Sequence, residues 1–357
     1  MNRLRVGVIG VGALGKHHAR ILSEMPEVEL VAVAEPRAEI GRQISEQYGC
    51  LHVGDYRELM DLVDAACVVV PTSQHLAVAS DLIRRRIPVL VEKPLAMDAE
   101  QGRILHKLSE NFETLLQVGH IERFNPVTEA AGPFIQSPQY IRAERFSPFP
   151  FRSMDIGVVL DVMIHDIDLA LDLCRSPVKS VEAFGISIMG GAEDVAQARI
   201  RFENGCVADL SAGRVSPTVT RTFQVWSANG CVTLNFAEKQ VTRIAPTQLL
   251  HSGPSPISLA QQPGANVEQL KQEIFDEYLK VQTVPVPIRD ALSAELHEFV
   301  QSIQLGMKPR CGGAEGLLAL QTAEKILASI EQHQWEGNSQ GMVGPQARLP
   351  GGLRKAG

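Results

Sequence analysis

Short apolar runs alternate with amphipathic segments along the first third of the chain. The runs end at glycine, proline or a polar residue, as buried strands do, and they occupy residues 4–9, 28–34, 66–70, 88–91 and 115–118. The segments between them carry apolar residues at helical spacing and occupy residues 13–25, 37–48, 74–86 and 98–111. Apolar strands separated by such helices are typical of a parallel sheet covered on both faces. We therefore expect an α/β domain over residues 1–122.

The pattern changes from about residue 140, where the expected strands become longer and alternate between apolar and polar positions. Asn204-Gly205 and Asn229-Gly230 each separate two such runs, which lie at residues 198–202, 206–212, 222–227 and 231–236. Asn-Gly favours a tight hairpin because both residues accept positive φ angles. We therefore expect a second α/β domain over residues 123–333, with a largely antiparallel sheet.

The remaining segments are expected to form further helices, a long loop and a tail. Residues 161–174 have the spacing of a helix, whereas residues 246–266 are rich in proline, glycine, serine and glutamine and indicate a long surface loop. Two helices near residues 290–305 and 314–333 are candidates to pack on the first domain. Residues 334–357 are glycine-rich and are expected to form a flexible tail.

Composition and charge narrow the classes of function. The chain has 357 residues, enough for two domains with separate cores. Its formal net charge of −7 argues against a general nucleic-acid or anionic-membrane surface. No apolar run reaches the roughly 18 residues needed to span a bilayer, the first residues lack a signal-peptide pattern, and the scattered cysteines form no CxxC pair. We therefore expect a cytoplasmic protein with reduced thiols, which binds a small molecule and neither nucleic acid nor membrane.

Gly10-Val11-Gly12-Ala13-Leu14-Gly15 matches the pattern G-x-G-x-x-G. Alone this pattern is weak, but here it follows an expected strand and opens an expected helix. In that context the first glycine allows a tight turn, the second lets the backbone approach a pyrophosphate, and the third lets helix and strand pack closely. Free N–H groups at the helix N-terminus add a site for phosphates. We expect a dinucleotide to contact Gly10, Gly12, Ala13, Leu14 and Gly15.

Glu35 follows the second expected strand. A carboxylate about 20 residues after the glycine motif accepts hydrogen bonds from the adenosine ribose and repels the 2′-phosphate of NADP. Arg37 is close enough in sequence to hold that phosphate, so NADP stays open as the alternative. The sequence favours NAD, with Glu35 and Arg37 in the cofactor site.

Two groups of polar residues are candidates for the chemistry. Lys93 directly follows an apolar strand run, and a lysine at such a strand end can polarise a substrate oxygen. Asp161 and His165 stand at i and i+4, so on a helix they share one face and could act on one substrate. Metal binding is disfavoured, because no further histidine or cysteine falls at ligand spacing. A salt-bridged structural lysine and a structural histidine remain the alternatives at this point.

Four motifs occur together in this chain: the opening Val6–Gly12, Glu92-Lys93-Pro94, the run Gly119–Pro126 (Gly-His-Ile-Glu-Arg-Phe-Asn-Pro), and Asp161-x-x-x-His165-Asp166. In this order and separation they resemble the glucose–fructose oxidoreductase / inositol dehydrogenase / MocA family, from residue 3 to about residue 333. Many dehydrogenases share the glycine motif, whereas Glu-Lys-Pro followed by Asp-x-x-x-His is far more specific. The run Gly119–Pro126 and the run Met163–Leu169 (Met-Ile-His-Asp-Ile-Asp-Leu) look like the branch that includes UDP-N-acetylglucosamine 3-dehydrogenases, which serve lipid A biosynthesis.

The resemblance implies an N-terminal Rossmann domain and a C-terminal α/β domain whose large, mostly antiparallel sheet forms a homodimer or homotetramer contact. It implies that His165 is the general acid/base, that Lys93 holds the reacting oxygen and shares the proton transfer, and that Asp161 orients the substrate or tunes Lys93. The nicotinamide end of the NAD site would contain Pro71, Thr72, His75, Glu92, Lys93 and Gln117. The substrate site would contain Lys93, His120, Arg123, Arg152, Asp161 and His165.

The resemblance further implies oxidation of a sugar hydroxyl, with the 3-hydroxyl of UDP-N-acetylglucosamine or a related sugar nucleotide favoured. A diphosphate substrate needs cations, and Arg145, Arg214 and Arg221 are also available. One alternative is a dehydrogenase of a free sugar or inositol. Another is a non-catalytic regulator that senses NAD or sugar, although such a protein would be expected to have lost the lysine or the histidine.

Overall fold

The computed structural model describes residues 3–151, 156–189 and 191–333, and its chain forms two compact units. Unit 1 joins three segments: Met1–Asn125, Phe151–Asp168 and Arg289–Glu331. Unit 2 consists of Pro126–Pro150, Leu169–Ile288 and Gln332–Gly357. The predicted domain boundary lies at residue 122, whereas the first segment of unit 1 ends at Asn125. Arg152 and the tail predicted for residues 334–357 lie outside the described residues.

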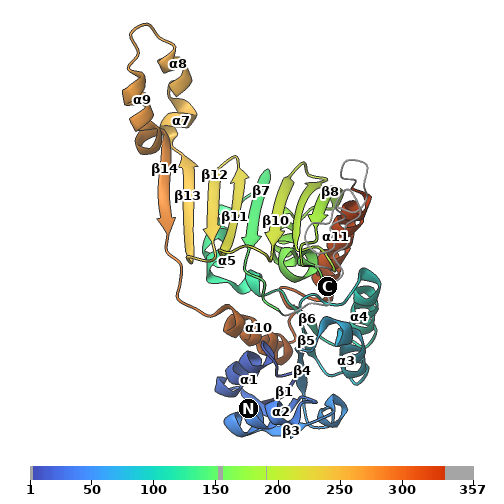
Figure 1. Ribbon diagram of the computed structural model, residues 1–357. Coiled ribbons are helices and arrows are strands. Elements are labelled where there is room, and N and C mark those ends of the chain that lie inside the picture. The colour runs from blue at the N-terminus through green and yellow to red at the C-terminus, as the bar shows by residue number, and fades with distance from the viewer. Residues whose placement is uncertain (1–2, 152–155, 190, 334–357) are drawn as a thin grey trace. The chain divides into compact units, whose positions relative to one another are not determined.

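Within the described residues, unit 1 is built around a parallel sheet of six strands (Figure 1). These are β1 (Leu4–Ile9), β2 (Val28–Ala34), β3 (Leu51–Val53), β4 (Ala65–Val68), β5 (Val89–Glu92) and β6 (Leu116–Gly119). They lie in the order β3-β2-β1-β4-β5-β6, with every neighbouring pair parallel. The order reverses beside β1, and sheets of this kind bind dinucleotides outside the carboxyl ends of their strands at that point. The predicted parallel α/β domain is confirmed.

The helices of unit 1 bury their apolar stripes against this sheet. They are α1 (Gly15–Glu24), α2 (Ala38–Tyr48), α3 (Thr72–Arg84), α4 (Ala99–Asn111), α10 (Ala291–Leu305) and α11 (Gly313–Gln332), with the 3-10 turns η1 (Tyr56–Leu59) and η2 (Ile121–Phe124). Val6 and Val8 of β1, Leu22 of α1 and Phe299 of α10 are fully buried in one apolar cluster. The late helix α10 therefore completes the core of the first domain. Among the described helices, none is long and apolar enough to cross a membrane.

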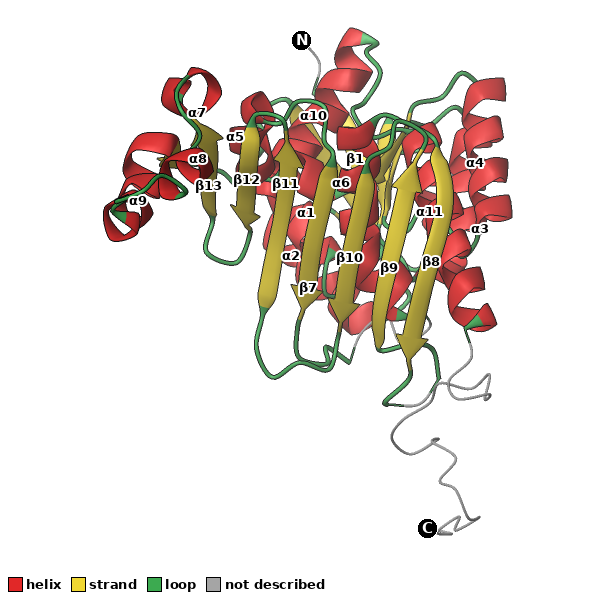
Figure 2. Ribbon diagram, turned by 90° about the horizontal axis from the view of Figure 1, so that it is seen from above, coloured by secondary structure: helices red, strands yellow, loops and turns green. Residues whose placement is uncertain are grey.

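Unit 2 is built around a sheet of eight described strands (Figure 2). They are β7 (Tyr140–Phe146), β8 (Val178–Ile186), β9 (Val195–Phe202), β10 (Val207–Gly213), β11 (Thr220–Ser227), β12 (Gly230–Asn235), β13 (Gln240–Pro246) and β14 (Leu279–Val284). They lie in the order β14-β13-β12-β11-β7-β10-β9-β8, and only β7 and β10 pair in parallel among these strands. Gly205 and Gly230 have φ angles of +88° and +105° at the two predicted hairpins. The predicted, mostly antiparallel sheet is confirmed.

The long loop predicted for residues 246–266 is wrong, because this segment contains two short helices. The helices of unit 2 are α5 (Pro126–Ala131), α7 (Gln248–Ser252), α8 (Pro256–Ala260) and α9 (Val267–Glu273), with the turns η3 (Gly132–Phe134) and η5 (Ile274–Tyr278). Figure 1 shows α7, α8 and α9 as an extension beyond β13 and β14. Helices of five residues are too short for a helical period to stand out. Pro256 begins α8, where its missing N–H costs little.

The helix predicted for residues 161–174 consists of two elements. A π-helical turn, η4 (Val159–Met163), contains Asp161, and the α-helix α6 (Ile164–Cys174) contains His165. A π turn differs from an α turn by one residue in its hydrogen-bond spacing, so the apolar pattern does not reveal it. Such turns are frequent at functional sites.

Candidate active site

The glycine motif forms a tight turn between β1 and α1. Gly10 has a φ of +84°, and a Cβ on Gly15 would lie 1.8 Å from the carbonyl oxygen of Gly10. Only glycine allows these two features. The side chain of Leu14, which precedes α1, is 43% exposed and does not cap the helix. The turn and the helix N-terminus therefore fit the pyrophosphate of a dinucleotide.

Glu35 lies directly after β2 and is only 2% exposed. Its carboxylate accepts hydrogen bonds from the backbone N–H of Val11 at 3.2 Å and from Nε of Arg37 at 2.7 Å. Burial opposes ionisation, but the hydrogen bonds from Arg37 and Val11 hold the pKa of Glu35 below its usual value. A Cβ on Gly12 would lie 3.3 Å from the Arg37 guanidinium. Both predicted residues thus stand beside the glycine turn, with charges of opposite sign.

Lys93 and Asp161 meet at the carboxyl end of β5. Lys93 Nζ donates a hydrogen bond to the backbone carbonyl oxygen of Asp161 at 2.6 Å and lies 3.2 Å from Asp161 Oδ1. Their side chains are 13% and 5% exposed. The carboxyl ends of parallel strands are where such sheets bind ligands, and a held ammonium there can donate to a substrate oxygen. The structure brings together two residues that are 68 positions apart in the sequence.

His165 is the second residue of α6 and is half-buried. It follows Asp161 through the wide turn η4. Both residues belong to unit 1, as does Lys93. The three residues predicted to be catalytic therefore come from the unit that carries the glycine turn.

Glu92, the last residue of β5, faces a histidine that the sequence analysis missed. Its Oε1 lies 2.9 Å from Nε2 of His18, which is 1% exposed on α1. Burial opposes ionisation of Glu92, but the hydrogen bond to His18 and the charge of Lys93 hold its pKa below the usual value. A signal was present, since His18 falls on the same buried stripe of α1 as Ile21 and Leu22.

The other residues predicted for the nicotinamide end lie near the start of α3 and on β6. The ring nitrogens of His75 lie 2.9 Å from the carbonyl oxygen of Pro94 and 3.0 Å from that of Val70, and burial lowers the pKa of this histidine. Gln117 is fully buried, and its Nε2 donates to the carbonyl oxygen of Glu295. Both side chains thus contact backbone here. The remaining predicted residues at the start of α3 are Pro71 and Thr72.

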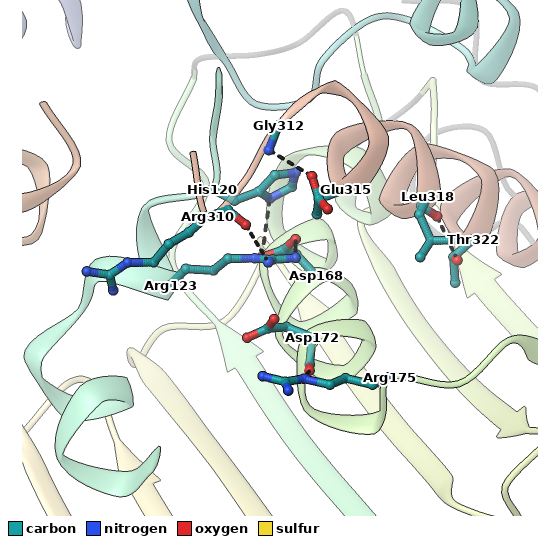
Figure 3. Close-up of polar contacts among 10 residues, drawn as sticks. All are labelled: His120, Arg123, Asp168, Asp172, Arg175, Arg310, Gly312, Glu315, Leu318 and Thr322. Atoms are coloured by element: carbon teal, nitrogen blue, oxygen red, sulfur yellow. Dashed lines mark hydrogen bonds and ion pairs between the residues drawn. The ribbon is translucent and has the colours of Figure 1, made fainter. Parts of the chain in front are cut away.

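Arg123 and Asp168 form a buried ion pair beside His120 (Figure 3). Nε and Nη2 of Arg123 each lie 2.7 Å from one oxygen of Asp168, and Nη1 donates to the carbonyl oxygen of Arg310 at 3.1 Å. His120 Nδ1 lies 3.9 Å from Asp168 Oδ2. Two residues predicted to bind substrate, His120 and Arg123, are therefore packed around Asp168.

His120, Asp168 and Cys311 place atoms of ligand type within 4.8 Å of one another. Both oxygens of Asp168 already accept hydrogen bonds from Arg123, whose positive charge opposes a cation at this place. Burial raises the pKa of the Cys311 thiol well above its usual value and lowers that of His120. We therefore assign these three residues to the packing of unit 1 and not to a metal.

Glu295 is a buried acid that was not predicted as a site residue. It lies on α10, is fully buried, and neither carboxylate oxygen has a hydrogen-bond partner among the described residues. Burial, followed by the charges of Glu92 and Glu298, raises its pKa well above the usual value. These surroundings favour the neutral form of Glu295. An acid on an amphipathic helix normally indicates an exposed position, so the sequence offered no signal.

Three arginines of unit 2 were candidates to bind a diphosphate, and each of them has different neighbours in the structure. Arg214 is buried, and its Nε lies 2.8 Å from Asp194 Oδ1. The guanidinium of Arg145 stacks 5.4 Å from the centre of the Phe236 ring. Arg221, on β11, pairs with Arg145 in the sheet register and is exposed. Arg221 is therefore the most accessible of these three.

Comparison with protein-family models agrees with this fold. Residues 4–120 match the oxidoreductase family with an NAD-binding Rossmann fold, and residues 137–233 match the GFO/IDH/MocA C-terminal domain. Together the two models match more than half of the chain. The chain belongs to the glucose–fructose oxidoreductase / inositol dehydrogenase / MocA family, as the resemblance of its motifs predicted.

Individual relatives are dehydrogenases. The UDP-N-acetylglucosamine 3-dehydrogenase of Acidithiobacillus ferrooxidans is 30% identical over 334 residues, covering 93% of this chain and 98% of the relative. A solved structure of that enzyme has a TM-score of 0.81 at 29% identity, covering 93% of this chain and 99% of the other. An inositol 2-dehydrogenase of Rhizobium meliloti is 25% identical over 346 residues, covering 92% and 97%. The protein is therefore an NAD-binding oxidoreductase, a dehydrogenase of this family.

Proposed function

We propose that this protein is an NAD-dependent dehydrogenase that oxidises one hydroxyl group of a sugar nucleotide, with the 3-hydroxyl of UDP-N-acetylglucosamine as the first candidate. The contact between Lys93 and Asp161 carries this proposal, because it holds an ammonium at the strand end where dinucleotide-binding sheets act on their ligands. The similarity to UDP-N-acetylglucosamine 3-dehydrogenase along nearly the whole chain supports the choice of substrate.

Oxidation of a secondary alcohol removes a proton from the oxygen and a hydride from the carbon. NAD⁺, when bound at the glycine turn, supplies the hydride acceptor. Lys93 donates a hydrogen bond to the substrate oxygen, and Asp161 holds the ammonium of Lys93 in place. His165 takes the hydroxyl proton. The products are the ketone, NADH and one proton.

We also propose that NAD is preferred over NADP. The buried carboxylate of Glu35 stands where the adenosine ribose binds in this fold, and its charge opposes a 2′-phosphate. Arg37 is held by that carboxylate at 2.7 Å, which occupies the side chain that would otherwise attract the phosphate.

A second candidate function is the oxidation of a free sugar or inositol. Two of the arginines considered for a diphosphate, Arg123 and Arg214, are engaged by buried aspartates. This observation favours a substrate that needs fewer cations, and inositol dehydrogenases are among the relatives.

A screen of NADH release separates the two candidates. The purified protein with NAD⁺ is offered UDP-N-acetylglucosamine, other UDP-sugars, free hexoses and inositols, and NADH is followed by its absorbance. Turnover with UDP-N-acetylglucosamine and none with free sugars is the expected result. Turnover with inositols or hexoses alone would establish the second candidate, and no NADH from any of them would overturn the proposal.

A further inference from the structure

His18 joins the helix that follows the glycine turn to the strand end that carries Lys93. The imidazole is 1% exposed, and its Nε2 lies 2.9 Å from Oε1 of Glu92. Its Nδ1 is buried and has no hydrogen-bond partner within the described part of the chain. The contact to Glu92 is therefore the polar contact through which the described residues hold this ring, and the tautomer with the proton on Nε2 donates to the carboxylate.

Glu92 is also in contact with Lys93. Its second oxygen, Oε2, accepts a hydrogen bond from the backbone N–H of Lys93 at 3.2 Å. A Cβ on Gly119, in the neighbouring strand β6, would lie 3.1 Å from the same oxygen, so glycine there leaves room for the carboxylate. These hydrogen bonds form a chain that runs from His18 through Glu92 and Lys93 to Asp161.

The contact between His18 and Glu92 affects the position of the Lys93 ammonium. An ionised carboxylate is a strong acceptor, and leaving one oxygen of the half-buried Glu92 without a donor is unfavourable. Without His18, Lys93 is the adjacent residue whose positive charge already acts on Glu92, so its ammonium could bind Oε1 instead. That ammonium would then be drawn away from Asp161, where its Nζ now lies 2.6 Å from the carbonyl oxygen.

We infer that His18 is a positioning residue for Lys93: it holds the Glu92 carboxylate on the Lys93 backbone, so that the Lys93 ammonium stays with Asp161. The inference rests on the proposed function in one respect, namely that Lys93 acts on the substrate oxygen. His18 itself touches neither substrate nor reacting atoms in this scheme. Its effect should therefore fall on kcat and much less on the binding of NAD⁺.

Two substitutions of His18 and one matched control test this role. His18→Leu should lower kcat about 10- to 100-fold, because small misplacements of a catalytic group cost that much, with Kd for NAD⁺ and KM for the substrate close to wild type. His18→Gln should recover most of the rate, because its amide N–H can reach Glu92. His17→Leu, on the exposed side of the same helix, should behave like wild type. A wild-type kcat in His18→Leu would overturn the inference, as would equal losses in the Leu and Gln variants.

A measurement without turnover separates this inference from the proposed function. His18→Leu and Glu92→Gln are combined, and the free energy of unfolding is measured for the single and double variants. Coupling between the two substitutions is expected, because each removes the same contact. Additive effects would show that His18 does not hold Glu92. If the wild-type protein oxidises no sugar, the proposed function fails, and this cycle alone decides the contact.

Discussion

Two carboxylates, one buried and one half-buried, stand near the two ends of the predicted cofactor site, each with its own partner. Glu35, beside the glycine turn, is held by Arg37, whereas Glu92, at the end of β5, is held by His18. In both cases a donor offsets the cost of burying a negative charge. Because Arg37 is already bound to Glu35, we expect recognition of the ribose to depend on both side chains together.

Glu35→Ala should relax the preference for NAD over NADP. The substitution removes an acceptor for the ribose hydroxyls and the charge that repels a 2′-phosphate, and it releases Arg37 to bind that phosphate. The ratio of kcat/KM for NAD⁺ to that for NADP⁺ should fall about tenfold or more, since a hydrogen bond to a charged group contributes about 1.5–3 kcal/mol. Arg37→Ala keeps the carboxylate and should not lower this ratio. If Glu35→Ala leaves it unchanged, Glu35 does not contact the ribose.

Single residues were predictable from sequence where a local motif surrounds them. Lys93 follows a strand run, and Glu35 stands at a fixed distance from the glycines, so the sequence alone makes both of them candidates. His18 and Asp168 act through partners 74 and 45 positions away, Glu92 and Arg123. No local pattern encodes such pairs, because they arise only when the strands and helices are packed together.

At the scale of elements, hydrogen bonds to Asp194 connect the ends of three strands in unit 2. Its carboxylate accepts hydrogen bonds from the backbone N–H groups of Ile188 at 2.7 Å and Met189 at 2.6 Å, just after β8, and from Arg214 at 2.8 Å, just after β10. Asp194 itself precedes β9 and is fully buried. Burial opposes its ionisation, but these donors hold the pKa of Asp194 below the usual value.

Asp194→Asn should destabilise the protein in a pH-dependent way. A carboxylate whose folded pKa is lowered stabilises the fold above its unfolded pKa of about 3.9. That contribution is lost as the pH falls through the lower, folded pKa. At pH 7 the variant should lose about 3–5 kcal/mol, the usual cost of breaking a buried ion pair, and the difference should shrink on acidification. Denaturant unfolding at several pH values measures it. Asp276→Asn, at an exposed position, is the control, and an equal loss at every pH would contradict this role.

Elements were predictable where a period of two or of about four residues persists. The strands β1 and β2 coincide with the predicted runs, and α2 ends at Gly49, which has a φ of +67° as a helix-ending glycine does. The short helices α7 and α8 and the π turn η4 were missed, because each is too brief to establish a period. The π turn matters most, since it carries Asp161.

At the scale of the whole molecule, the dinucleotide-binding unit is assembled from three separated stretches of chain. The first provides the glycine turn and Lys93, the second provides Asp161 and His165, and the third provides α10 with the buried Phe299. A single domain boundary in the sequence cannot separate unit 1 from unit 2, because unit 1 contains three separate segments of the chain. The proposed catalytic set is complete only when the first two stretches are folded together.

The central claim is that Lys93, held by Asp161, acts in NAD-dependent oxidation of a sugar hydroxyl. Its most direct test measures NADH release from UDP-N-acetylglucosamine by the wild-type protein and by Lys93→Met, with NAD⁺ binding measured on the same samples. The wild-type protein should release NADH, and Lys93→Met should lose about 10²- to 10⁴-fold in rate, the usual contribution of a proton-transferring side chain, with its Kd for NAD⁺ unchanged. Rates near wild type in Lys93→Met would contradict the claim.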